Sequence, residues 1–304
     1  PERRRPLRRR VGRAGQCRRE DLLGPGVTRG HVFQPEPGGH EGGFVPFELD
    51  LTKAVRPGRN EIRVRVQSES IADSVSCISQ YAAHQVGGLI RKVTLFAVPQ
   101  AFVSELWYET AVTGSDARVV VHADLAPVSA GATPVIQHRL LDPSGRRVAA
   151  VTGEAPLPVK AARLWTPETP ALYTLETILS IGGKPAQGLR HRIGLREIRV
   201  TGNRVFVNGR PIKLLGINRH EVHPLRGRSL TPELCRRDAE LFRAANVNLV
   251  RTSHYPPSEE FLDACDELGI FVESEAAICW VQHGASPYWK TNDHLDPTFF
   301  PYLL

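Results

Sequence analysis

The pattern of apolar and polar positions predicts β-structure over the first two thirds of the chain. Residues 46–51, 62–66 and 89–97 each alternate apolar with polar positions, which is typical of half-buried strands. Pro57–Asn60 supplies a turn between two of them. We therefore expect a β-domain over residues 38–98.

The same alternation continues in residues 99–195. Residues 119–125 and 136–140 alternate, and Asp142–Gly145 combines a proline with a glycine that accepts a positive φ. Short strands with turns at this spacing predict a β-sandwich of roughly 95 residues.

The period changes beyond residue 196. Asn208-Gly209 predicts a hairpin, and Thr231-Pro232 predicts the start of a helix whose apolar face carries Leu234, Leu241, Phe242 and Ala245. A second helix is expected over 257–268, with Gly269 just past its end. Short apolar runs at 212–217, 247–250 and 270–272 alternate with these helices, which predicts parallel strands in a barrel or an open α/β sheet.

Polar residues cluster at the ends of these three expected strands. The clusters are Asn218-Arg219-His220-Glu221-Val222-His223-Pro224, Arg251-Thr252-Ser253-His254-Tyr255-Pro256 and Glu273-Ser274-Glu275. The carboxyl ends of parallel strands meet at one edge of a sheet, and active sites of barrels lie there. We expect these side chains to converge on one polar pocket.

Three interpretations of the histidines remain open. His220, His223 and His254 could meet as metal ligands, although His-x-x-His in a loop is a weak signal and the helical His-Glu-x-x-His pattern is absent. They could instead be structural and bind neighbouring loops. They could also bind sugar hydroxyls, because neutral imidazole offers one donor and one acceptor.

The basic charge of the chain is concentrated at its start. Residues 1–20 contain 9 arginines and 2 glutamates, a balance of 9 − 2 = +7, and the other residues hold 39 − 9 = 30 basic and 32 − 2 = 30 acidic side chains. A nucleic-acid-binding domain would spread basic residues over a folded face. We expect residues 1–37 to be an arginine-rich, disordered leader and expect no nucleic-acid partner.

Composition bears on the compartment as well. No apolar run approaches the roughly 20 residues of a membrane span, and no apolar stretch follows the first arginines as in a secretory signal. We therefore expect no membrane partner. The 5 cysteines are scattered, which favours free thiols in a reducing, cytoplasmic compartment.

The polar clusters are also where a family resemblance becomes specific. Asn-Arg-His-Glu-x-His-Pro (218–224), followed by Arg-Thr-Ser-His-Tyr-Pro (251–256), resembles the barrel entry of family 2 glycoside hydrolases, the family of β-galactosidases, β-glucuronidases and β-mannosidases. Upstream segments resemble the same family in the same order: His40–Phe47, Gly87–Arg91, Trp165–Tyr173 and Phe206–Gly209.

The resemblance implies a multidomain β plus α/β fold. Residues 38–98 would be a partial jelly-roll sugar-binding β-sandwich, residues 99–195 an immunoglobulin-like β-sandwich, and residues 196–304 the first strands of a (β/α)8 TIM barrel. The first jelly-roll strands would be replaced by the leader, so the chain is expected to be truncated at both ends.

The resemblance also implies retaining hydrolysis of β-glycosides by two glutamates. The acid/base would follow an Asn at strand four and the nucleophile would lie at strand seven, so both are expected beyond Leu304 and the isolated chain is expected to be inactive. The expected substrate-binding residues are His254, His223 and Asn218, then Arg219 and Glu275, either of which could instead brace the barrel rim. The resemblance thus implies a carbohydrate substrate and no cofactor. It is also compatible with a homo-oligomer of the full-length parent protein.

Three departures from the family pattern bear on the substrate. Cys279 and Val281 stand where magnesium-dependent β-galactosidases hold their metal, so no metal is expected, and Ala82 stands where several members have an Asp that reaches the substrate. Glu259 and Glu260 favour the glucuronidase-like members. The alternative is a non-catalytic carbohydrate-binding or scaffolding protein built from the two β-domains.

Overall fold

The computed structural model describes residues 38–40, 46–66, 89–126 and 133–276, and its chain divides into two compact units. The described part of the first unit comprises residues 93–126, 133–215 and 265–271. The second comprises residues 38–40, 46–66, 89–92, 216–264 and 272–276. Neither helix in these ranges is long and apolar enough to cross a membrane.

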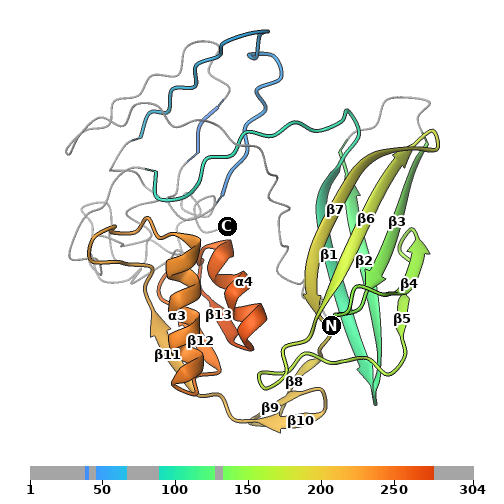
Figure 1. Ribbon diagram of the computed structural model, residues 1–304, viewed down its shortest axis with the longest axis vertical. Helices are drawn as coiled ribbons and strands as arrows, with labels where there is room; N and C mark the ends of the chain where they lie inside the picture. The colour runs from blue at the N-terminus through green and yellow to red at the C-terminus, as the bar shows by residue number, and fades with distance from the viewer. Residues whose placement is uncertain (1–37, 41–45, 67–88, 127–132, 277–304) are drawn as a thin grey trace. The chain divides into compact units, whose positions relative to one another are not determined.

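The first unit is built on two antiparallel sheets (Figure 1). The three-stranded sheet has the order β1 (Val103–Thr113), β2 (Asp116–Leu125) and β5 (Leu157–Val159). The four-stranded sheet has the order β4 (Arg147–Thr152), β3 (Pro134–Leu141), β6 (Leu172–Ile181) and β7 (Lys184–Gly194).

One apolar core is shared by these two sheets. Val119 and Val121 of β2, Leu140 of β3 and Leu175 and Leu179 of β6 are all buried in it. Each of these residues alternates with less buried neighbours along its strand, because successive side chains point to opposite faces. The strands expected around residues 119–125 and 136–140 are confirmed.

The turn expected after β3 is also present. Asp142 Oδ1 accepts hydrogen bonds from the backbone N–H groups of Ser144 and Arg146 at 2.9 and 3.0 Å. Gly145 adopts φ +85°, a conformation that costs glycine little. Local turn chemistry therefore suffices to reverse the chain here.

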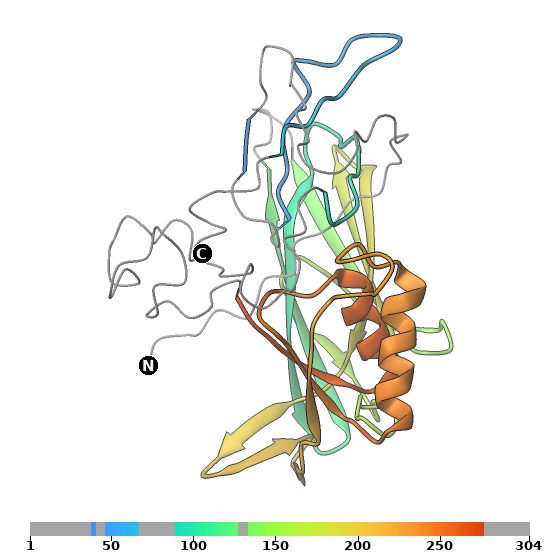
Figure 2. The same cartoon turned by 90° about the vertical axis from the view of Figure 1, so that its left-hand side faces the viewer.

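A small third sheet confirms the expected hairpin. Its order is β10 (Arg210–Ile212), β9 (Arg204–Val207) and β8 (Ile198–Thr201) (Figure 2). Asn208 and Gly209 both have positive φ, +51° and +76°, as a two-residue hairpin turn requires. The Asn208 side chain also accepts from Glu197 N at 2.9 Å and donates to Trp165 O at 3.1 Å, so it anchors the hairpin beyond its own turn.

The second half of the chain alternates strand and helix. The order is β11 (Gly216–Arg219), α3 (Pro232–Ala244), β12 (Leu249–Thr252), α4 (Glu259–Leu268) and β13 (Phe271–Ser274). β11 and β12 pair in parallel, β12 is also bonded to β13, and both helices lie on the same face of this sheet (Figures 1 and 2). The described residues form this three-stranded sheet and do not close a barrel.

Both predicted helix ends are confirmed. Thr231 is the N-cap of α3 and its hydroxyl accepts from Leu234 N at 3.4 Å, with Pro232 at the first helical position. Gly269 follows α4 with φ +77°. Capping residues are recognisable in sequence because they satisfy backbone groups locally.

The positions of the parallel strands were predicted too early in the sequence. The expected run 212–217 is divided between β10 and β11, and the strands expected at 247–250 and 270–272 are β12 and β13. The ladder pairs Asn218 with Arg251 and Arg219 with Thr252, so polar residues form part of the strands instead of following them. Strand pairing uses backbone hydrogen bonds, which form whatever the side chain. The apolar run therefore does not mark where a strand ends.

The face predicted for α3 is wrong in part. Leu241 is 48% exposed and Ala245 is exposed, whereas Cys235 and Ala239 are buried. Phe242 does face inward and meets the Phe261 ring edge-on at 6.4 Å. The small residues Cys235 and Ala239 let the helix approach closely, and size rather than hydrophobicity decided which stripe is buried.

The strands expected within residues 38–98 are not formed in the described parts of that range. Residues 46–66 and 89–98 contain no strand, and Phe47, Ile62 and Val93 are 49%, 47% and 53% exposed. Alternation marks a face that can be buried, but a strand also needs a hydrogen-bonded neighbour, and no strand of the described residues pairs with these segments. Only the turn at Asn60 is confirmed, where Nδ2 donates to Arg56 O at 2.8 Å.

Within the first unit, Trp165 packs against the last turn of α4 and the first residue of β13. It is fully buried, donates from Nε1 to Asp266 O at 2.8 Å and meets the Phe271 ring edge-on at 5.1 Å. The Arg196 guanidinium stacks over its ring at 4.4 Å, and burial lowers the Arg196 pKa. This aromatic contact brings the end of α4 against the loop that carries Trp165.

Candidate functional site

The ends of the three parallel strands bring polar side chains together. His220 directly follows β11, His254 follows β12 after Ser253, and Glu275 directly follows β13. The His220 and His254 rings lie 5.4 Å apart and nearly perpendicular, at 74°. The predicted convergence is therefore observed for these residues, because parallel strands end at the same edge of the sheet.

His254, Glu275 and Arg251 form the centre of this cluster. His254 Nδ1 lies 3.0 Å from Glu275 Oε2, and Arg251 Nε donates to Glu275 Oε1 at 2.6 Å. A carboxylate offers no proton, so the short contact requires the His254 proton on Nδ1. In the neutral form of the ring Nε2 then carries the lone pair, and a hydroxyl group is the matching donor. The Ser253–His254 peptide bond is cis.

His220 is the more weakly held of the two rings. It is exposed, and its ring centroid lies 6.1 Å from that of Tyr255. Partial desolvation of the ring by its neighbours, followed by the fields of His254 and Arg228, lowers the His220 pKa. The ring is therefore neutral at pH 7 and can both donate and accept a hydrogen bond.

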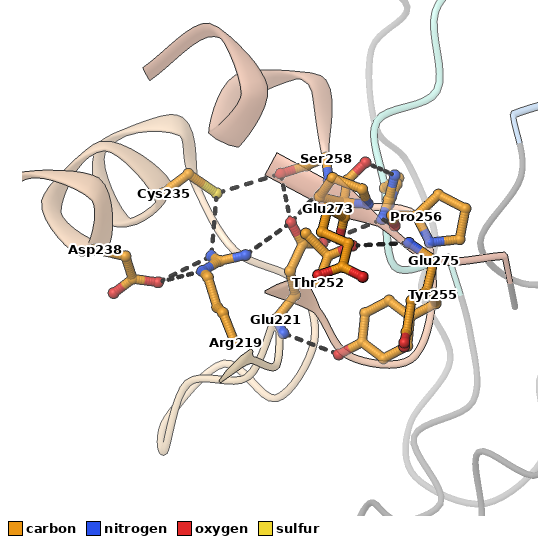
Figure 3. Close-up of polar contacts among 12 residues, drawn as sticks. Arg219, Glu221, Cys235, Asp238, Thr252, Tyr255, Pro256, Ser258, Glu273 and Glu275 are labelled. Carbon is orange, nitrogen blue, oxygen red and sulfur yellow. Dashed lines mark hydrogen bonds and ion pairs between the residues drawn. The ribbon is translucent and has the colours of Figure 1, made fainter. Parts of the chain in front are cut away.

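A buried ion-pair network lies beside this cluster (Figure 3). Arg219 donates from Nε to Asp238 Oδ2 at 2.9 Å and from NH1 to Glu221 Oε1 at 3.1 Å, and its guanidinium stacks on Phe261 at 3.9 Å. Burial opposes the charge on Arg219, but Glu221 and Asp238 outweigh it and raise the Arg219 pKa. With its side chain only 3% exposed, Arg219 is placed to brace the strand end rather than to meet a ligand.

The structure does not bring every predicted residue to the cluster. Asn218 lies in β11 with an exposed side chain, opposite Arg251 in the ladder. His223 turns to its own loop, where Nδ1 accepts from Leu225 N at 3.2 Å and its backbone bridges to Gly227. The contacts of the His223 ring and backbone are thus made within its own loop.

A metal centre finds no support in the described residues. No group of three or more His, Cys, Asp or Glu side chains there is arranged to hold a metal ion. Cys279, Val281 and Ala82, on which the expectations about metal and substrate partly depend, lie outside the described residues.

Three residues of the site were not assigned a role from the sequence. Glu221 accepts from Arg219, Arg91 and Ser258, Tyr255 OH accepts from Glu221 N at 2.9 Å, and Arg91 reaches the loop after His254. Glu221 and Arg91 both belong to recognisable motifs. Their contact could not be predicted from the motifs, because Arg91 and Glu221 lie 130 positions apart in the sequence.

Comparison with known proteins identifies the family. Residues 101–196 match the family model described as "Glycosyl hydrolases family 2", and residues 198–296 match "Glycosyl hydrolases family 2, TIM barrel domain". The chain belongs to family 2 of the glycosyl hydrolases, a class of glycosidases. The strand ends carrying His220, His254 and Glu275 lie within the residues that match the TIM-barrel description.

Its similar proteins include both galactosidases and glucuronidases. The chain is 31% identical to a β-galactosidase of Arthrobacter sp. (strain B7), over 82% of this chain and 24% of the relative. It is 32% identical to the β-glucuronidase of Rattus norvegicus, over 78% of this chain and 40% of the relative. The chain thus spans between 24% and 40% of the length of these two curated relatives.

A solved structure shows a similar fold. The β-glucuronidase of Ruminococcus gnavus in complex with uronic isofagomine superposes with a TM-score of 0.58 and 31% sequence identity. The match covers 62% of this chain and 30% of that chain.

Proposed function

We propose that this chain is part of a retaining β-glycosidase that hydrolyses terminal β-glycosidic bonds, and that it supplies a sugar-binding portion of the barrel's catalytic face. The observation that carries the proposal is the convergence of His220, His254 and Glu275 at three adjacent strand ends, with His254 held 3.0 Å from Glu275. Family membership supplies the reaction class.

In this proposal His254 is the principal sugar ligand. Its Nδ1 proton is directed to Glu275, so Nε2 is the acceptor for a sugar hydroxyl. Asn218 is a further ligand, and its exposed position supports this role. His223 would contribute only from its own loop, where its Nδ1 accepts from Leu225 N. Arg219 takes the bracing role, because Asp238 and Glu221 bind its guanidinium. Glu275 does so as well, because its carboxylate is held by Arg251 and His254.

β-Glucuronides are the substrates to test first. Glucuronidases occur both among the similar curated proteins and among the solved structures. Glu259 and Glu260 do not bear on this choice, since they lie at the start of α4 and pair with Lys92 at 3.4 and 3.0 Å. The preference therefore rests on overall similarity, and β-galactosides remain in the test.

The domain division is part of the proposal. Residues 38–98 correspond to a jelly-roll domain, residues 99–195 to an immunoglobulin-like sandwich and residues 196–304 to the start of a (β/α)8 barrel, following a leader over residues 1–37. Support comes from the two sheets with one core in the second segment and from the alternation of strand and helix in the third.

We also propose that the 304-residue chain alone does not turn over substrate. Retaining hydrolysis needs two carboxyl groups about 5 Å apart, one of them free to act as nucleophile. Of the glutamates at the described strand ends, Glu273 is exposed, whereas Glu221 and Glu275 are each held by an arginine and Glu221 is only 6% exposed. Measurable turnover of 4-nitrophenyl β-D-glucuronide that persists through repeated purification of the chain would contradict this.

A chimera tests the function itself. Residues 89–276 would replace the corresponding stretch of the Ruminococcus gnavus β-glucuronidase, which supplies the rest of a barrel. We expect hydrolysis of 4-nitrophenyl β-D-glucuronide, and a loss of at least about 100-fold in kcat/KM for His254→Ala, because a hydrogen bond that strengthens in the transition state is removed.

The control is His122→Gln, which changes a histidine of β2 and is expected to leave kcat/KM within about twofold. Circular dichroism confirms folding of each variant. If the folded His254→Ala chimera is as active as the His122→Gln chimera, His254 does not belong to the site. If the chimera hydrolyses only β-galactosides, the assignment to β-glucuronides is wrong.

A further inference from the structure

In the second unit, one arginine far upstream in the sequence contacts the loop that follows His254. Arg91 donates from NH2 to Pro256 O at 2.7 Å and from NH1 to Pro257 O at 3.0 Å. The same guanidinium reaches Glu221 Oε2 at 3.1 Å. A single side chain therefore binds two consecutive carbonyl groups and a carboxylate.

The geometry of these acceptors suits arginine. The guanidinium presents five N–H donors in a fixed planar fork, whereas a lysine ammonium is a point charge with three donors. The Arg91 side chain is 28% exposed and that of Glu221 only 8%, so the pair is largely sheltered from water. Removing the arginine would leave a buried carboxylate with one cation fewer, which is far costlier than breaking a surface ion pair.

Glu221 holds the same loop from its other end. Its Oε1 accepts from Ser258 N at 2.7 Å and from Ser258 Oγ at 2.8 Å, while its own backbone N–H donates to Tyr255 OH. Residues 255–258 are therefore fixed at both ends by Glu221 and in the middle by Arg91 (Figure 3 shows the Glu221 contacts). His254 directly precedes this loop.

We propose that Arg91 is a positioning residue for the sugar site: through the carbonyls of Pro256 and Pro257 and the carboxylate of Glu221 it holds the loop 255–258, and with it the His254 ring, in the orientation that sugar binding needs. The inference rests on the proposed function, in which His254 meets the sugar. It also gives a role to the Gly-Gly-x-x-Arg motif of residues 87–91, which lies outside the barrel segment.

The neighbouring residue provides a matched control. Lys92 pairs with Glu259 and Glu260, but its side chain is 63% exposed, so its ion pairs are screened by water. Four forms of the 304-residue chain would be compared: wild type, Arg91→Ala, Arg91→Lys and Lys92→Ala. Amide hydrogen exchange and the imidazole nitrogen signals of His254 would be measured for each.

We expect Arg91→Ala to accelerate exchange of the Tyr255 and Ser258 amides by at least about tenfold, while the amides of β2 keep their wild-type rates. The His254 ring should lose its uniform Nδ1-protonated signal, which a purely structural role would leave intact. Arg91→Lys should show a smaller change of the same kind, and Lys92→Ala should match wild type. If Arg91→Ala does not fold, Arg91→Lys carries the same comparison.

Unchanged exchange at the Tyr255 and Ser258 amides, equal acceleration in β2, or an unaltered His254 ring in the arginine variants would overturn the proposal. Titration with D-glucuronate separates it from the proposed function. Binding that weakens at least about tenfold in Arg91→Ala but not in Lys92→Ala supports both. A wild-type chain that does not bind D-glucuronate, while exchange and ring signals still respond to Arg91→Ala, contradicts the sugar site and leaves the positioning role standing.

Discussion

At the scale of single residues, burial assigns different tasks to arginines that look equivalent in sequence. Arg219 is 3% exposed in its side chain and is held by Asp238 and Glu221, so it braces β11. Arg251 is 34% exposed and holds Glu275 against His254. Arg196 stacks on Trp165 in the first unit. Each role follows from which acceptor lies within reach of the guanidinium.

The tautomer of His254 is a consequence of Glu275 and can be tested. Glu275→Gln removes the negative charge and places both a donor and an acceptor beside Nδ1, so the ring should change from one tautomer to a mixture. Two-bond ¹H–¹⁵N correlation spectra measure this directly. Glu273→Gln is the matched control, because Glu273 lies two residues earlier and is exposed. A single unchanged tautomer in Glu275→Gln would exclude the carboxylate as the cause.

His138 in the first unit makes stability depend on pH. It is 1% exposed, its Nδ1 lies 2.9 Å from Thr177 Oγ1, and burial lowers its pKa to about 4. The folded state therefore binds this proton less readily than the unfolded chain. Its contribution to stability is fully present above about pH 6.5 and is lost as the pH falls toward 4.

Urea unfolding at pH 7 and at pH 4.5 measures that loss. The wild-type chain should lose about 2 to 3 kcal/mol through His138 between these values. In His138→Gln, which cannot take up the proton, the decrease should be smaller by that amount. An identical decrease in both chains would show that other groups carry the pH dependence.

At the scale of elements, the end of α4 depends on one glycine. Gly269 has φ +77°, and a Cβ at this position would lie 2.1 Å from Pro167 O. Both the left-handed backbone and the close approach exclude a side chain. The loop carrying Trp165 and the end of α4 can therefore meet without strain only if this residue is a glycine.

Gly269→Ala should destabilise the first unit by about 3 kcal/mol, the sum of the conformational penalty and the displaced backbone. Gly145→Ala is the control: it has φ +85° but open space around the added Cβ, so it should cost only about 1 kcal/mol. Urea midpoints followed by tryptophan fluorescence give both values. Equal losses would mean that the contact with Pro167 yields without cost.

At the scale of the whole molecule, the charge distribution separates two classes of partner. The surplus of +7 lies in residues 1–20, and the remaining residues balance at 30 basic and 30 acidic. Any affinity for nucleic acid should therefore depend on that segment alone. A folded basic face, by contrast, would survive its removal.

Deleting residues 1–20 should abolish binding to a short DNA duplex and to a cation exchanger at neutral pH. In the undeleted chain, residual DNA binding should fall steeply between about 50 and 200 mM salt, as expected for phosphate contacts that release counterions. Fluorescence anisotropy of labelled DNA measures the loss of binding on deletion and its dependence on salt, and the elution position measures binding to the exchanger. DNA binding by the deleted chain that also falls steeply with salt would reveal a second basic surface.

The elements predicted correctly are those whose signals are local. The hairpin at Asn208, the cap at Thr231 and the turn at Asp142 each satisfy their own backbone groups within a few residues. The site was predicted through the order of strands and helices, since parallel strands must end together. The strands of residues 38–98 were not found in the described parts, because alternation says nothing about a neighbouring strand.

The sequence by itself determined the family, the alternation of strand and helix, and the polar residues at the strand ends. Only the tertiary structure decided which of those residues are buried in ion pairs and which remain exposed. Glu221, buried between Arg219 and Arg91, and Glu275, held between Arg251 and His254, are both glutamates at strand ends. Glu221 is buried, whereas the Glu275 side chain is 25% exposed. The sequence does not reveal this difference, because burial and ion pairing depend on contacts between distant segments that form only when the chain folds.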